Sequence, residues 1–75
     1  MNTHVVEAAE RTLQAFERAV ELAPRSSSAH LALGDALAKS GDTASAGNEW
    51  REAALLEPGS REAQKRLRAA GLPPP

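Results

Sequence analysis

The chain has 75 residues, 10 of them acidic and 9 basic, so it is one small domain with little room for a deep catalytic cleft. It contains no cysteine, which excludes disulfides and thiolate metal sites, and a net charge of −1 gives no general attraction to nucleic acid or to an anionic membrane. Sixteen alanines and 9 leucines are typical of helices, so we expect an all-α fold.

Four helices are predicted, at about 4–22, 27–40, 43–57 and 61–70, in a single domain of residues 1–72 followed by a proline tail at 73–75. The first helix has apolar residues at alternating spacings of three and four. The breaks and N-caps that separate the helices are Pro24 with Ser26, Gly41 with Asp42 or Thr43, and Pro58 with Ser60. Turns this short predict antiparallel helical hairpins.

The third predicted helix carries Trp50, which we expect in the core because apolar neighbours share its helical face. The inward positions of this helix are Ala46, Trp50, Ala53 and Leu56, and the outward positions are Asn48, Glu49, Arg51 and Glu52. In the second helix, Asp35 and Lys39 are four residues apart and are expected to form a surface ion pair.

The sequence superposes on itself at an offset of 34 residues. Phe16 then falls on Trp50, and seven pairs are identical: Ala19 with Ala53, Leu22 with Leu56, Pro24 with Pro58, Ser26 with Ser60, Ala29 with Ala63, Leu33 with Leu67, and Ala36 with Ala70. Helix breakers, caps and apolar positions all recur. Such a pattern is typical of a repeated helical hairpin.

A 34-residue unit of two helices resembles the tetratricopeptide repeat (TPR) family. The complete unit is 27–60, with Leu33 and Gly34, then Ala46, Trp50 and Pro58 at the family's spacing, while His30 and Leu37 replace two aromatics. Half a unit precedes it and half follows. The resemblance implies a TPR-like right-handed superhelical array of four helices, in which the basic fourth helix is a solvating cap.

The resemblance also implies a non-enzymatic protein–protein interaction module that binds a peptide or a partner helix in a concave groove. The groove residues carried over from the family are Ser28, Leu31, Asp35, Lys39, Lys65 and Arg66. Lys65 and Arg66 favour an acidic stretch in the partner. The chain lacks the two-carboxylate clamp of those family members that bind chaperone tails, because Leu31 and Asp35 occupy the corresponding positions.

No residue pattern predicts an enzyme, a cofactor or a metal site. His30 is interpreted as a packing residue, and Ser26, Ser27 and Ser28 as capping residues. The basic last helix has no interleaved aromatics for stacking on bases, so nucleic acid is not the expected partner. No apolar run approaches 18 residues and no signal peptide is present, so we expect a cytoplasmic chain without a membrane partner.

An alternative function is structural self-association, as a homodimer or by docking to a larger scaffold. The first helix has no hairpin mate before it, so part of its apolar face is expected to stay open. The residues predicted for self-association are Val5, Val6, Ala9, Leu13 and Phe16. A closed two-fold dimer is favoured over a head-to-tail assembly, because apolar burial outweighs exposed charge pairs.

Overall fold

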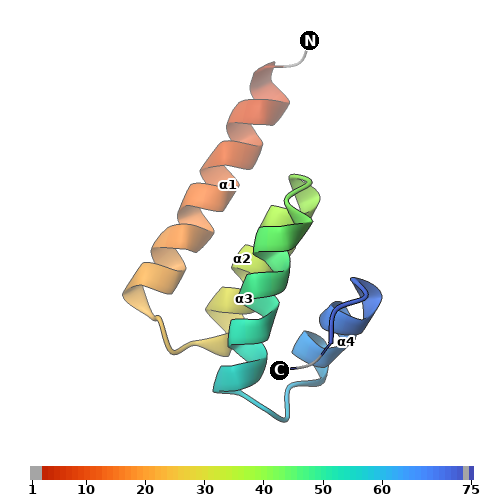
Figure 1. The fold of residues 1–75 in the computed structure, drawn as a ribbon. Helices are drawn as coiled ribbons and strands as arrows, with labels where there is room; N and C mark the ends of the chain where they lie inside the picture. Colours follow the sequence, from red (N-terminus) through yellow and green to blue (C-terminus); the bar gives the residue numbers. More distant parts are fainter. Residues whose placement is uncertain (1–2, 74) are drawn as a thin grey trace.

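The computed structural model describes residues 3–73 and 75, with side chains from residue 10 on, and shows four helices joined by short turns (Figure 1). They are α1 (Thr3–Leu22), α2 (Ser27–Lys39), α3 (Thr43–Leu56) and α4 (Arg61–Ala69). No strand occurs among the described residues, so the all-α prediction is confirmed. Each helix begins and ends within one residue of its predicted bounds.

Local capping explains where the helices begin. A side-chain oxygen in each turn accepts a hydrogen bond from a backbone N–H in the first turn of the next helix: Ser26 from Ala29 at 3.2 Å, Asp42 from Ser45 at 3.1 Å, and Ser60 from Ala63 at 3.3 Å. Thr43, the other candidate cap, is the first residue of α3. Gly41 (φ 93°) follows α2 and Gly71 (φ 72°) follows α4, in the left-handed conformation that glycine adopts without strain.

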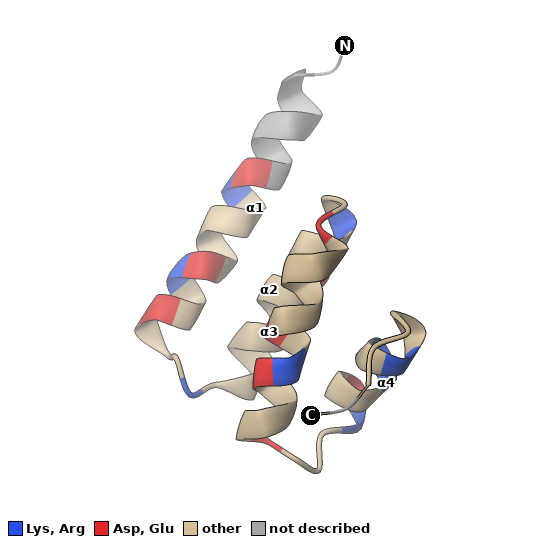
Figure 2. Ribbon diagram, in the orientation of Figure 1, with Lys and Arg blue, Asp and Glu red and all other residues tan. Residues whose placement is uncertain are grey.

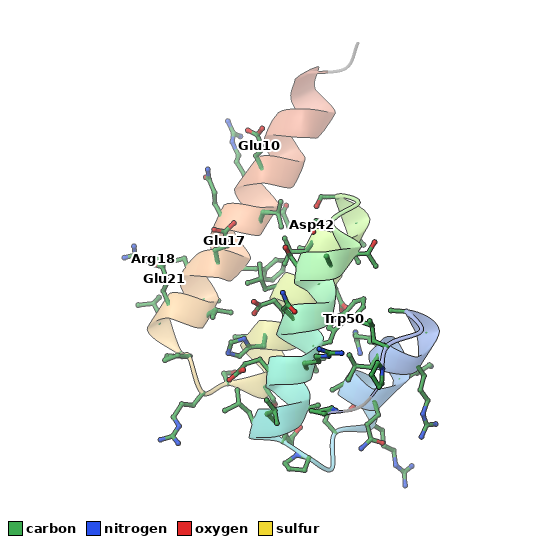
Figure 3. All side chains as sticks on the ribbon, in the orientation of Figure 1. Glu10, Glu17, Arg18, Glu21, Asp42 and Trp50 are labelled. Atoms are coloured by element: carbon green, nitrogen blue, oxygen red, sulfur yellow. The ribbon has the colours of Figure 1, made fainter. Side chains whose placement is uncertain are left out.

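The core lies between α2, α3 and α4 and is built mainly from alanine. Its buried members are Ala46, Trp50, Ala53 and Ala54 of α3 with Ala63 and Leu67 of α4. Trp50 is only 6% exposed and lies on the inner side of α3 (Figure 3), which confirms the prediction for it. Leu56, predicted to face inward, is half-buried. Among the described residues of α1 none is buried, so α1 packs on α2 without entering this core.

Gly34 allows α2 and α3 to approach closely. A Cβ atom at this position would lie 2.5 Å from Trp50 Nε1, 2.6 Å from Trp50 Cδ1 and 3.2 Å from the carbonyl oxygen of Ala46. The indole therefore occupies the space that any side chain at position 34 would need. A large aromatic and the absence of a side chain together set the distance between the two helices.

We expect Gly34→Ala to lower the free energy of unfolding, because overpacking against Trp50 costs about 1 to 3 kcal/mol and the helix propensity of alanine offsets only up to about 1 kcal/mol. The matched control is Gly47→Ala in α3, where the new Cβ meets only the flexible end of Leu72. Chemical denaturation followed by circular dichroism measures both. Equal stability of the two variants would contradict the packing of Trp50 on Gly34.

Candidate partner-binding site

A hollow of about 220 Å³ lies between α1 and α2 and is only partly filled by side chains. We call it the α1–α2 groove and define it by its lining residues: Thr12 and Phe16 of α1 with Ala32, Asp35, Ala36 and Lys39 of α2. Phe16 is half-buried, and small alanines form the opposite wall. A cavity of this size and lining can take one large apolar side chain.

Asp35 closes one side of the α1–α2 groove with a hydrogen-bonded cluster that joins three helices. Its carboxylate accepts bonds from Arg66 Nε at 2.6 Å, from Arg66 NH2 at 2.9 Å and from Trp50 Nε1 at 3.1 Å. This two-point contact with Asp35 raises the pKa of the Arg66 guanidinium. The expected surface pair of Asp35 with Lys39 is wrong, because Asp35 is turned toward α3 and α4.

The structure places the residues predicted for the concave groove in different environments. Asp35 and Lys39 line the α1–α2 groove, and Ser28 is exposed on α2. Leu31 is half-buried and packs against the core. Arg66 is held by Asp35, so of the two basic residues expected to attract an acidic partner only Lys65 remains exposed.

Lys65 belongs to a basic stripe along the exposed side of α4. It lines a surface depression with Arg61, Gln64 and Arg68, and Figure 2 shows the basic residues of α4 in blue. These positions lie opposite the buried Ala63 and Leu67, as expected for a helix with one face in water. The stripe is separate from the α1–α2 groove.

The residues predicted for self-association lie on α1. Leu13 and Phe16 are half-buried, so α2 covers part of the apolar face and leaves part of it open. The side chains of Val5, Val6 and Ala9 lie outside the described residues. Sequence reasoning assigned Phe16 only to self-association and missed its place in the groove. The signal was present, because Phe16 matches Trp50 at the 34-residue offset.

His30 ties the turn between α1 and α2 to α3. It is 7% exposed, with Nε2 2.8 Å from the carbonyl oxygen of Pro24 and Nδ1 2.8 Å from Oε1 of Glu49. Both partners can only accept hydrogen bonds, so both ring nitrogens carry protons in the best-bonded state. Burial lowers the pKa of His30, but the bonds to Pro24 and Glu49 and the nearby charges of Glu49 and Glu52 outweigh it and raise the pKa above 6.5.

Packing is therefore only part of the role of His30, and the prediction that Glu49 faces outward into water is wrong. Glu49 is half-buried because it bonds to His30 across the α2–α3 contact. No spacing rule pairs two residues on different helices, so the sequence offered no signal for this contact.

No group of three His, Asp or Glu side chains within the described part of the chain is placed to hold a metal ion. None of the described helical segments combines the length and apolar content needed to cross a membrane. Comparisons with family models, with curated proteins and with solved structures gave no significant match.

We expect the free energy of unfolding to decrease as the pH rises through the folded-state pKa of His30. The folded pKa is raised above the unfolded value, so the stabilisation is complete below pH 6.5 and disappears at higher pH. Denaturation curves between about pH 5.5 and pH 9 measure this loss. This loss of stability with rising pH should be absent in His30→Gln and should occur at lower pH in Glu49→Gln.

The matched control is His4→Gln, which removes the other histidine of the chain. It should retain the pH dependence of the unmodified protein. Loss of that dependence in His4→Gln, or its persistence in His30→Gln, would show that another group is responsible.

Proposed function

We propose that this chain is a non-enzymatic protein–protein interaction module, similar to a tetratricopeptide repeat, that binds a peptide or a partner helix in the α1–α2 groove. The observation that carries this proposal is the open, apolar-walled groove beside Phe16. An aromatic side chain beside small alanines is a surface that excludes water readily once it is covered. The spacing of Gly34, Ala46, Trp50 and Pro58 supports the resemblance to the family.

Charge near the groove supports a preference for acidic partners. Lys39 lies at the groove and is exposed, and it has no ion pair with any described residue. Asp35 adds no free negative charge, because Arg66 neutralises it at 2.6 Å. A carboxylate of the partner would therefore meet one free cation, with a contribution of a fraction of a kcal/mol that salt reduces.

A displayed library of random peptides tests the proposal. We expect selection on the unmodified protein to enrich peptides that bind it. These peptides should not bind the Ala32→Glu variant, in which a charged side chain is placed in the groove. The matched control is Ala44→Glu, which adds the same charge at an exposed site on α3 and should bind as the unmodified protein does. Calorimetric titration of the enriched peptides gives Kd for each variant.

The circular dichroism of Ala32→Glu should match that of the unmodified protein, so that loss of binding reports on the groove and not on unfolding. Absence of enriched peptides, or peptides that bind both variants equally, would contradict a binding function of the α1–α2 groove.

A second candidate function is self-association through α1, and the exposure of this helix favours it. Leu13 and Phe16 of its apolar face are covered only in part. A second molecule could cover this surface, and apolar burial contributes about 25 cal/mol for each Å² that leaves water. Among the described residues of α1, acidic and basic side chains alternate along the helix (Figure 2), so this part of α1 neither strongly attracts nor strongly repels the same part of a second copy.

Light scattering coupled to gel filtration tests self-association. If α1 forms a dimer, the mass at high micromolar concentration is about twice 7.9 kDa, and Leu13→Glu restores the monomer because it places a charge in the apolar face. The matched control is Arg18→Glu on the side of α1 that faces away from α2 and α3 (Figure 3), which should leave the dimer intact. A strict monomer at this concentration would rule out this second function.

A further inference from the structure

The α1–α2 groove has a filled counterpart in the same molecule. At the 34-residue offset, Thr12 corresponds to Ala46, Phe16 to Trp50, and Ala32 to Arg66. The first two counterparts lie on α3 and the third on α4, and α2 contacts all three. α1 and α2 form the groove in the same way that α3 and α4 form the surface against which α2 packs.

Contacts of α2 show how this counterpart is filled. Gly34 lies against Trp50 and against the carbonyl of Ala46, while Asp35 reaches Arg66 at 2.6 Å. His30 extends to Glu49 at 2.8 Å. α2, with Gly34 at its closest approach, therefore contacts Trp50 and Ala46 of α3 and Arg66 of α4 at the same time.

Exposure separates the two surfaces residue by residue. Ala46 is completely buried, and Thr12 at the corresponding position is exposed. Trp50 is 6% exposed, whereas Phe16 is half-buried. Ala53 is completely buried, and Ala19 is half-buried. At all three positions α1 is less covered than α3, which packs against both α2 and α4.

We propose that the α1–α2 groove is a binding site for one amphipathic helix of a different protein, with a glycine or alanine facing Phe16. This inference rests on the proposed function and names the kind of partner. The helix lies in the groove as α2 lies on α3 and α4. It buries Phe16 against its small residue, as Gly34 does for Trp50.

Residues in and beside the groove define the chemistry of this helix further. Ala15, beside the groove, and Ala32, in it, stand where the filled surface has Glu49 and Arg66, which bond to His30 and Asp35 of α2. The bound helix therefore has small apolar residues at these two contacts, because a buried polar group would find no partner there. Lys39 at the rim is unpaired among the described residues, so the helix carries a carboxylate near it.

Neither α2 nor α4 of a second copy of this chain offers such a helix. Its α2 has the required glycine, but Trp50 of the same molecule already covers Gly34. Its α4 carries Arg68 where α2 carries Gly34, and that long charged side chain would meet Phe16. We therefore name a helix of a different protein as the partner, and a dimer through α1 is the competing outcome that the variants below distinguish.

A stapled helical peptide tests this inference. The probe copies residues 26–42 with His30→Ala and Asp35→Ala, because Ala15 and Ala32 stand where these two side chains have their polar partners in the filled surface; it retains Gly34 and Asp42. We expect the protein to bind this probe, and a matched probe with Gly34→Leu to bind at least about tenfold more weakly. Equal binding of both probes would overturn the small-residue contact with Phe16.

The position of the probe is measured with a tryptophan reporter. In a Trp50→Phe, Phe16→Trp variant, the fluorescence of the single tryptophan should shift to the blue when the probe binds. If Trp50→Phe disturbs folding, fluorine NMR of a labelled phenylalanine at position 16 gives the same information in the unmodified sequence. An unchanged signal at position 16 at saturating probe concentration would overturn the proposal.

Two further variants check the chemistry of the site. Ala32→Glu should abolish binding of the probe, and Lys39→Glu should weaken it in a salt-dependent manner. Library peptides that bind the groove in an extended form, while the helical probe does not bind, would overturn the helix site and leave the proposed function intact. Dimers of the unmodified chain that Ala32→Glu dissociates would overturn the choice of a different protein as partner.

Discussion

The contact of Trp50 with Gly34 and Asp35 determines how the helices of this molecule are arranged. The indole ring fills the space above Gly34, and its N–H donates to the Asp35 carboxylate, which also holds Arg66. One aromatic side chain thus connects α3 to α2, and one carboxylate extends the connection to α4. In a core made mainly of alanine, which buries little area per residue, the two large side chains, Trp50 and Leu67, carry much of the apolar contact.

Alanine packing brings helices close together but specifies their relative rotation poorly, because small side chains interdigitate little. Directional contacts supply what is missing. Arg66 binds Asp35 through two nitrogens, and His30 bonds to Pro24 on one side and to Glu49 on the other. All these groups lie between helices and have their partners in place. A buried polar group that loses its partner costs about 1 to 3 kcal/mol, so rotated arrangements of the same helices are disfavoured.

The sequence predicts whatever depends on neighbouring residues. Helix bounds, the caps at Ser26 and Ser60, the left-handed glycines and the burial of Trp50 all follow from spacing within one helix or turn. Contacts between helices were not predictable in this way. The four-residue spacing predicts an ion pair of Asp35 with Lys39 on the same helix, whereas Asp35 binds Arg66, thirty-one residues away. Pairing rules along a helix give no information about side chains that a fold brings together from different helices.

The α1 side and the α4 side of the structure expose different surfaces. After α4, the chain turns at Gly71 and lays Leu72 on Gly47, so the last turn covers part of α3 with the chain's own side chain. The outer side of α4 is charged, so its exposure to water is not unfavourable in free energy. The open side of α1 instead presents Phe16 beside alanines. An aromatic that is half-buried beside a hollow retains contact with water that a bound helix would remove. This asymmetry is the physical reason for proposing a partner at the α1 end.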